Sequence, residues 1–487
     1  MLASLLATSV GSSGFSRAAA RYDFRGVRDQ ALAAIAAGKA TGLAVAALHR
    51  DRIVWTEGFG WANRERQLKA TPHTPFCLAS ISKPFTTTAL ASLAAEGKVS
   101  LDEPANKYLR QLPLRGIDSN AATVRQLGAH AAGLPPLFEM YPDADDTRPP
   151  TVEALLRSYG ELAFPPGRLY EYSNIGCAAL GAIASTLTGQ PLGAIITQRV
   201  IRPLGLRDSF FADRSRLARA AAGYDELDRS IPYYTTATPA SGEIYASAHD
   251  LARFASFNLK NQPESGQSVL SRGWIDELHA PVLRGPDAGA TTFGWFSGRS
   301  HSGLPVLFKD GGQPGVSTTM YLVPSENVAC LVLANRTDNG DLTQSLVDQM
   351  IAAMLSGWTT PDTRMDAPGS PFSGEPAYVG NWSGRLRGEG VEATLELEIS
   401  ARAAATLAID GQPAERISDL QFRGPALTGT TAGSIAGSDA ERNHTTRLSL
   451  ELLPYNGSLV GRILASASSP GRLAAIPFTV SLDRART

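Results

Sequence analysis

Up to about residue 358, segments with helical spacing of apolar side chains alternate with segments that have the spacing of strands. Between residues 22 and 38 apolar side chains recur at helical spacing, which predicts an opening helix that Gly38 can end. Residues 43–48 and 53–55 are apolar and flank a polar turn at residues 50–52, which predicts a β-hairpin. Two predicted strands therefore precede the helical region that begins at residue 84.

The middle and the end of this region have different patterns. Residues 84–230 contain Leu- and Ala-rich helical stretches separated by Pro and Gly, which predicts a largely helical insertion. Strands are expected again at residues 306–308, 318–323 and 328–333. A last helix at residues 342–355 places its apolar side chains on one face.

The composition changes after residue 358, and we expect a domain boundary there. Residues 359–376 are rich in Pro, Gly, Ser, Asp and Thr, as a linker is. In residues 377–487 apolar and polar residues alternate over short segments, which predicts a small all-β barrel or sandwich. Residues 428–438, rich in Gly, Ser, Thr and Ala, are expected to form a flexible loop.

Charge and hydropathy exclude several classes of protein. The chain has 487 residues, 43% of them hydrophobic, and 45 basic side chains nearly balance 46 acidic ones. Neither a nucleic-acid partner nor a polybasic membrane contact is expected, because both need surplus positive charge. No apolar run approaches the roughly 20 residues of a membrane span.

No metal or cofactor is expected. Three cysteines are too few for a disulfide framework and are expected to be buried thiols, and the seven histidines are scattered without metal-ligand spacing. His130 is expected to be a structural residue at a turn. Residues 1–22 form a separate arm or a weak leader; without a positive n-region they favour a cytoplasmic protein over an exported one.

Lysine is rare in this chain, and its positions are informative. There are seven lysines against 38 arginines. A guanidinium stays protonated in a protein, whereas an amine can lose its proton. A lysine retained in such a chain is therefore a candidate for proton transfer.

Lys83 follows Ser80 by three residues at the start of a predicted helix. Pro84 is tolerated only in the first turn of a helix, so Ser80 must lie at or beside the helix N-terminus. There the unpaired N–H groups and the positive end of the helix dipole favour a developing oxyanion, and the spacing puts both side chains on one face. An ordinary capping serine beside an exposed lysine is the alternative.

Two further segments follow in a fixed order. Tyr172 and Asn174 form Tyr-x-Asn after a Pro/Gly turn, and Lys309, Asp310 and Gly311 form Lys-x-Gly at the end of a strand. Each alone is a weak signal. The ordered set Ser-x-x-Lys, Tyr-x-Asn, Lys-x-Gly is strong.

With these motifs the sequence resembles the serine β-lactamase and penicillin-binding protein superfamily, in particular its class C β-lactamase-like branch. The stretch at residues 127–135 and the segments at 202–206 and 239–242 support the resemblance. It implies an α/β domain at residues 23–358, with an antiparallel sheet flanked by helices, an all-helical lobe and the site between them. Residues 378–384 are similar to the start of a lipocalin-like barrel.

The resemblance implies a role for each motif residue. Ser80 is the acylated nucleophile, and Lys83 and Tyr172 share the acid and base work. Asn174, Lys309, Asp310 and Gly311 bind substrate, and the backbone N–H groups of Ser80 and Gly312 form the oxyanion hole. Which of Lys83 and Tyr172 takes the proton stays open.

Asp310 departs from the family pattern, whose third motif usually reads Lys-Thr-Gly or His-x-Gly and whose hydroxyl helps to hold a substrate carboxylate. A carboxylate repels the carboxylate of a β-lactam or of a peptide C-terminus. The departure favours neutral or ammonium-bearing substrates, unless Asp310 points away or pairs with an arginine.

The expected function is therefore a serine hydrolase that cleaves a small-molecule ester, amide or peptide bond through an acyl-enzyme on Ser80. Transfer of the acyl group to an amine, by peptide transfer or macrocyclisation, is the first alternative. A non-catalytic sensor or scaffold is the second, although a binding-only site has no need of a deprotonatable lysine. A homo-oligomer is possible.

Overall fold

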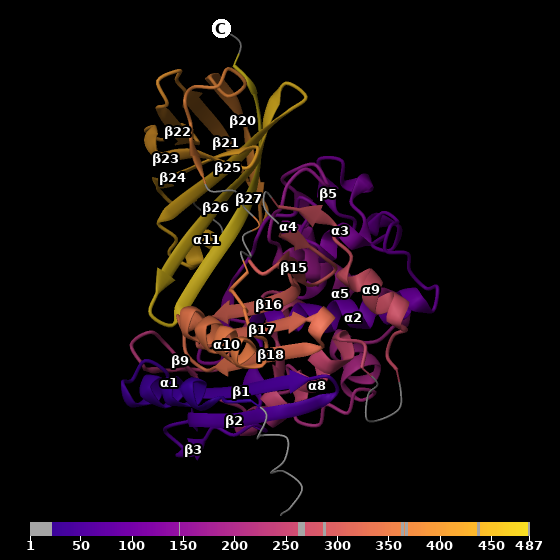
Figure 1. The fold of residues 1–487 in the computed structure, drawn as a ribbon. Coiled ribbons are helices and arrows are strands. Elements are labelled where there is room, and N and C mark those ends of the chain that lie inside the picture. The colour runs from indigo at the N-terminus through magenta and orange to yellow at the C-terminus, as the bar shows by residue number, and fades with distance from the viewer. Residues whose placement is uncertain are drawn as a thin grey trace, which may run out of the picture.

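An antiparallel sheet of nine strands forms the centre of the larger domain in the computed structural model (Figure 1). The structure describes residues 22–145, 147–261, 268–285, 289–361, 365, 369–435 and 439–485, so the expected N-terminal arm or leader lies almost wholly outside the described residues. In spatial order the strands are β13 (Leu283–Arg284), β14 (Ala290–Thr291), β15 (Phe296–Arg299), β16 (Pro305–Gln313), β17 (Val316–Val323), β18 (Val328–Ala334), β1 (Gly42–His49), β2 (Arg52–Asn63) and β3 (Leu68–Lys69).

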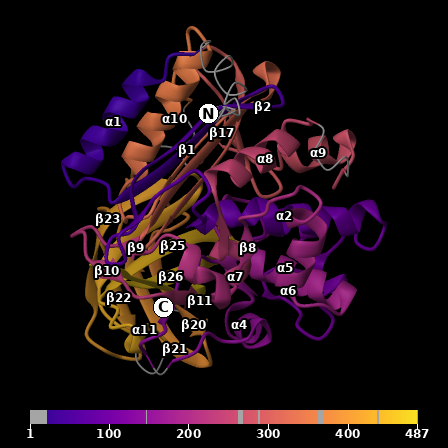
Figure 2. The ribbon, with the colours of Figure 1, turned by 90° about the horizontal axis from the view of Figure 1, so that it is seen from below.

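Helices cover both faces of this sheet, as Figure 2 shows. The terminal helices α1 (Arg25–Ala36) and α10 (Gly340–Met354) pack on one face, and α8 (Ala248–Asn258) packs on the other. Successive side chains of a strand point to opposite faces, so alternate residues of β1 enter two different apolar clusters. Burial on both faces explains why β17 and β18 contain almost no exposed positions.

A helical lobe lies beside the α8 face of the sheet (Figure 2). Its helices are α2 (Ser82–Ala95), α3 (Val124–Gly128), α4 (Val152–Tyr159), α5 (Asn174–Thr188), α6 (Leu192–Ile196), α7 (Pro239–Gly242) and α9 (Arg272–His279). Short strands connect them: β4 (Phe76–Cys77), β5 (Arg115–Gly116), β6 (Met140–Pro142), β7 (Glu161–Leu162), β8 (Phe210–Phe211), β9 (Gly223–Tyr224), β10 (Ser230–Ile231), β11 (Tyr234–Thr236) and β12 (Ile244–Ala246). The predicted helical insertion is thus mainly helical, with two- and three-residue strands between its helices.

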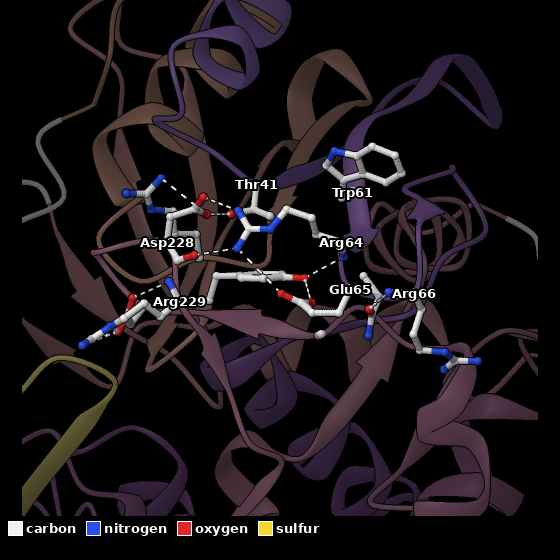
Figure 3. A network of polar contacts seen from close by, with 12 residues as sticks. Thr41, Trp61, Arg64, Glu65, Arg66, Asp228 and Arg229 are labelled. Atoms are coloured by element: carbon white, nitrogen blue, oxygen red, sulfur yellow. Dashed lines mark hydrogen bonds and ion pairs between the residues drawn. The ribbon is translucent and has the colours of Figure 1, made fainter.

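A polar network ties the turn between β9 and β10 to the end of β2 (Figure 3). The Arg64 guanidinium forms an ion pair with Asp228 and donates a hydrogen bond of 2.7 Å to the Asp228 carbonyl oxygen. The Thr41 hydroxyl donates to the Asp228 carboxylate at 2.6 Å. These contacts fix a long connection of the helical lobe against the sheet, on the side that Figure 3 shows.

A closed barrel of eight antiparallel strands follows the α/β domain. The strands are β20 (Gly380–Gly388), β21 (Val391–Ile399), β22 (Ala405–Ile409), β23 (Glu415–Arg423), β24 (Ala426–Ala432), β25 (Arg447–Tyr455), β26 (Ser458–Ser469) and β27 (Arg472–Arg484), with α11 (Asp439–Arg442) beside them and β19 (Ser370–Pro371) pairing with β23. Pairing of β20 with β27 and of β23 with β24 closes the ring. Trp382 is buried in it and donates from Nε1 to the Tyr378 carbonyl at 2.7 Å.

The prediction of a flexible loop at residues 428–438 is wrong for residues 428–432. Residues 428–432 belong to β24, which pairs with both β23 and β25. Small residues such as Gly429 are required here, because a Cβ at this position would lie 2.4 Å from Ile417. Composition suggested flexibility where close packing between strands selects small side chains; residues 436–438 lie outside the described residues.

Across the described ranges, no single helix is both long enough and apolar enough to cross a membrane. The segments Asn174–Thr188 and Leu192–Ile201, bent by 81°, meet the length and composition criteria only as a pair.

Candidate active site

Ser80 lies in a single 3-10 turn, Ala79–Ile81, that leads directly into α2. The preceding residue, Ala79, has a φ of 45°, in the left-handed region that residues with a Cβ seldom adopt. Pro84 is the third residue of α2, in its first turn, as its missing N–H requires. The result is a half-buried serine at the start of a helix that is buried except at its last residue, Ala95.

The Ser80 hydroxyl oxygen accepts hydrogen bonds from two candidate proton-transfer groups. Lys83 Nζ lies 3.0 Å from Ser80 Oγ, and the Tyr172 hydroxyl donates to the same oxygen at 2.6 Å. Lys83 Nζ also donates to the Ser241 carbonyl oxygen at 3.3 Å. Residues 92 positions apart therefore meet at one oxygen atom, and the arrangement has the geometry of a nucleophile with its acid and base.

Burial changes the proton affinities of both groups in opposite directions. Loss of hydration lowers the pKa of Lys83 to about 8, although Cys177 and Asp310 counteract this. Loss of hydration raises the pKa of Tyr172, with Lys309 counteracting. Near neutral pH the amine can therefore be uncharged while the phenol keeps its proton.

Lys309 lies on β16, next to this cluster, and is only 1% exposed. Its ammonium lies 5.1 Å from the centre of the Tyr172 ring and 4.1 Å from that of Phe296. Burial lowers the pKa of Lys309, and the neighbouring Lys83 lowers it further. Cation–π contact with two rings offsets part of the cost of burying this charge.

Gly311 brings β16 close to the turn that carries Ser80. A Cβ at Gly311 would lie 2.3 Å from the Leu78 carbonyl oxygen and 3.0 Å from the Ser80 nitrogen, so only glycine permits this approach. A two-residue turn joins β16 to β17, so Gln313 and Val316 form a hydrogen-bonded pair. Hydrogen-bonded and non-hydrogen-bonded pairs alternate along an antiparallel ladder, so the N–H of the next residue, Gly312, points away from β17. Strand β15 pairs only with residues 305–308, so this N–H faces the cleft.

Asn174 is the first residue of α5, two residues after Tyr172. Its side-chain amide donates to the Leu137 carbonyl oxygen at 2.7 Å. This hydrogen bond fixes the orientation of the side chain, and no described residue donates a hydrogen bond to its amide oxygen.

Asp310 is exposed and lies on the opposite side of β16 from Lys309 and Gly311. Its register partner Thr319 hydrogen-bonds Thr343 of α10, on the sheet face away from Ser80. Among the described residues no arginine pairs with it. Its charge nevertheless raises the pKa of Lys83 and of Lys309, so its field reaches both lysines.

His130 holds the backbone on both sides of Tyr172. Its carbonyl oxygen accepts from the Glu171 N–H at 2.9 Å, and its Nδ1 accepts from the Ser173 N–H at 3.1 Å. The imidazole lies 4.3 Å from the Tyr172 ring, centre to centre. Burial and the two nearby lysines keep the pKa of His130 well below its usual range, so the ring is neutral. These contacts agree with the structural role expected from the sequence.

Several residues of the site carried no motif signal. Phe296 lies against the Lys309 ammonium, and the Thr318 hydroxyl donates to the Leu78 carbonyl oxygen at 3.0 Å. In the sequence both are ordinary strand residues. Only their alternation within a strand could have assigned them to a face. Glu171 stands next to Tyr172 in the sequence, but its hydrogen-bond partner, Arg462, lies 291 positions away.

The rest of the described chain has few other candidate centres. No group of three or more His, Cys, Asp or Glu side chains within it could hold a metal ion. Cys77, Cys177 and Cys330 are buried free thiols, as expected. A cavity of about 160 Å³ lies beside the end of β16, lined by three tyrosines and by Cys77.

Most of the α/β domain is similar to known proteins. The model of the Beta-lactamase family matches residues 28–353. Protein flp of Staphylococcus aureus (strain N315) is 27% identical over 323 residues, which are 64% of this chain and 63% of flp. The chain thus matches less than two thirds of the length of such curated relatives.

Two solved structures share the fold. A class C beta-lactamase superposes with a TM-score of 0.60 at 18% identity, covering 68% of this chain and 97% of that one. SurE superposes with a TM-score of 0.64 at 18% identity, covering 95% of this chain and 98% of that one. The second likeness therefore extends through the barrel.

Proposed function

The chain belongs to the Beta-lactamase family, whose model spans residues 28–353, and from that premise we propose that it cleaves an ester or amide bond through an acyl-enzyme on Ser80. One observation carries the proposal: a single hydroxyl oxygen lies within hydrogen-bond distance of both a buried amine and a phenol, at 3.0 Å and 2.6 Å.

Lys83 is the proposed proton acceptor in the first step. Its pKa of about 8 leaves a useful fraction of neutral amine near pH 7, whereas Tyr172 keeps its proton because its pKa is raised. The Ser80 proton moves to Lys83 Nζ as Ser80 Oγ attacks the carbonyl carbon. The oxyanion accepts hydrogen bonds from the N–H groups of Ser80 and Gly312.

Collapse of the tetrahedral adduct expels the leaving group, which takes a proton from the Lys83 ammonium through the Tyr172 hydroxyl. Tyr172 donates one proton and receives another, so it ends unchanged. Lys309 supports this transfer, since its charge favours the transient phenolate. Water then attacks the acyl carbon, its proton passes back along the same groups, and Ser80 is released.

Substrate preference is proposed from one feature. The exposed carboxylate of Asp310 lies on the sheet face away from Ser80, but its field reaches Lys83 and Lys309, and this field weakly disfavours anionic substrates relative to neutral or ammonium-bearing ones. This field favours an ester or amide that has no carboxylate near the scissile bond.

The test is covalent labelling followed by intact-mass analysis. A fluorophosphonate is expected to add one phosphonyl group to the unaltered protein and none to a Ser80→Ala protein. Ser100→Ala, which removes an exposed hydroxyl, is the matched control and should label fully. Activated esters, D-amino-acid amides and a cephalosporin, each with and without an added amine, then identify the acyl donor and acceptor. Full activity of Ser80→Ala on every substrate found would exclude the proposal.

A further inference from the structure

The barrel reaches the catalytic site through one buried arginine. Arg462 lies on β26, and its side chain is 9% exposed. Its Nε donates to the Glu171 carboxylate at 2.6 Å, and its Nη2 donates to Glu451 at 2.6 Å. Glu171 directly precedes Tyr172, so a barrel side chain is bound to the neighbour of a proposed proton-transfer residue.

The three side chains form a network that is closed to solvent. Glu171 and Glu451 are 4% and 5% exposed, and Glu451 is the cross-strand partner of Arg462 in the barrel. A buried carboxylate is strongly disfavoured unless a charge of opposite sign compensates it. Arg462 therefore holds Glu171 in one position, since a carboxylate that left the guanidinium would stay buried without this ion pair.

The surrounding contacts transmit this restraint to Tyr172. The Glu171 N–H donates to the His130 carbonyl oxygen and the Ser173 N–H to the His130 ring, so the backbone is held on both sides of Tyr172. The Glu171 side chain is a further anchor of this segment, and it is bound to the barrel. An apolar contact beside it, of Leu453 and Val460 with Phe164, seals the interface.

A second barrel contact lies beside the residue that hydrogen-bonds Asn174. Phe138 and Ala475 of β27 exchange two backbone hydrogen bonds, of 3.0 Å and 2.8 Å. The neighbouring Leu137 carbonyl oxygen accepts the hydrogen bond from Asn174. Figure 1 shows the long strands β26 and β27 running from the barrel down to the α/β domain.

We propose that Arg462 is a positioning residue of the catalytic site, holding Tyr172 at Ser80 through Glu171. The barrel is then a working part of the site. The inference rests on the proposed function, because it assigns Arg462 a role through Tyr172 in acylation of Ser80.

Four variants test it, with fluorophosphonate labelling of Ser80 as the rate measurement. Arg462→Gln is expected to slow labelling at least tenfold. Arg462→Lys should recover part of that loss, because an ammonium can serve one carboxylate but cannot fork between two. Glu171→Gln, which keeps an acceptor for Arg462, should slow labelling less than Arg462→Gln. Glu451→Gln is the matched control: it removes a charge from the same network but does not touch the Tyr172 segment, and should label within twofold of the unaltered protein.

A second readout is independent of the chemistry. With ring-labelled tyrosine, the Tyr172 NMR signal, assigned by its loss in Tyr172→Phe, should shift or broaden in Arg462→Gln and stay in place in Glu451→Gln. A loss of stability alone would lower the melting temperature without moving this signal in the folded protein.

The outcomes separate the two proposals. If the unaltered protein is not labelled, the proposed function fails, and the Tyr172 signal alone decides whether Arg462 holds that residue. If the unaltered protein is labelled and folded Arg462→Gln is labelled equally fast with an unmoved Tyr172 signal, the positioning role is overturned. If Arg462→Gln does not fold, Glu171→Gln decides: slower labelling supports the role, and an unchanged rate overturns it.

Discussion

Replacing Lys83 by arginine keeps the positive charge but removes the ability to lose a proton, and so isolates the proposed base. The pKa of Lys83 lies at about 8, against 10.5 for the group in water, because burial disfavours its charged form. Arginine cannot take up the Ser80 proton at any pH at which the protein is folded. The substitution therefore converts a question of mechanism into a measurable rate.

The expected size follows from the population of neutral amine. At pH 7.5 a group with a pKa of about 8 is neutral in about one molecule in four, whereas a lysine at 10.5 is neutral in about one in a thousand. The ratio is about 240-fold, or about 3 kcal/mol of activation free energy. Lys83→Arg should therefore acylate Ser80 at least about 100-fold more slowly.

The assay is the rate of phosphonylation of Ser80 between pH 6 and pH 9. For the unaltered protein the rate should rise about tenfold per pH unit and level off above about pH 8, where the amine is already neutral. Lys98→Arg, at an exposed lysine, is the control and should follow the same curve. A flat profile for the unaltered protein, or an unchanged rate in Lys83→Arg, would refute Lys83 as the base.

Three further predictions concern stability and selectivity. Lys83→Met should raise the free energy of unfolding at pH 7 by about 1–3 kcal/mol, because the pKa of Lys83 is lower in the folded protein than in the unfolded chain and the folded protein must otherwise bury its charge. Denaturant titration should show this gain shrinking between pH 8 and 10.5, and a gain independent of pH would contradict the prediction. Gly311→Ala should lower the stability by about 1–3 kcal/mol, since its Cβ would lie 2.3 Å from a carbonyl oxygen, whereas Gly312→Ala, with nothing within 4 Å, should change it by less than about 0.5 kcal/mol; equal melting temperatures of the two variants would show that β16 can move away. Asp310→Thr should raise kcat/KM for a carboxylate-bearing substrate relative to an ammonium-bearing one by about three- to fivefold, because an exposed charge is screened and worth less than about 1 kcal/mol; an unchanged ratio would remove Asp310 from substrate selection.

The elements predicted from periodicity are those whose pattern is local. The hairpin of β1 and β2, the strands β16 to β18 and the helices α1 and α10 all lie where apolar spacing places them. Each of these elements needs only its own apolar face to be recognised, because period 2 and period 3.6 are properties of the backbone. The family resemblance rests on the same footing, since its three motifs are short and ordered.

Other features depend on residues far apart in sequence, and no local pattern encodes them. The 3.0 Å contact of Lys83 with Ser80 follows from their i,i+3 spacing, but the 2.6 Å contact of Tyr172 with the same oxygen requires the helical lobe to fold against the sheet. The strand at residues 428–432 appears only because ring closure of the barrel gives small residues two neighbours.

The sequence by itself predicted the candidate nucleophile, the candidate base and the order of the motifs, because these follow from helix spacing and from the chemistry of the side chains. The tertiary structure alone decided the pKa of Lys83, the exposure of Asp310 and the bond between Glu171 and Arg462, 291 positions apart. The physical reason is that burial and charge pairing depend on what surrounds a group in space, and those surroundings come from distant parts of the chain.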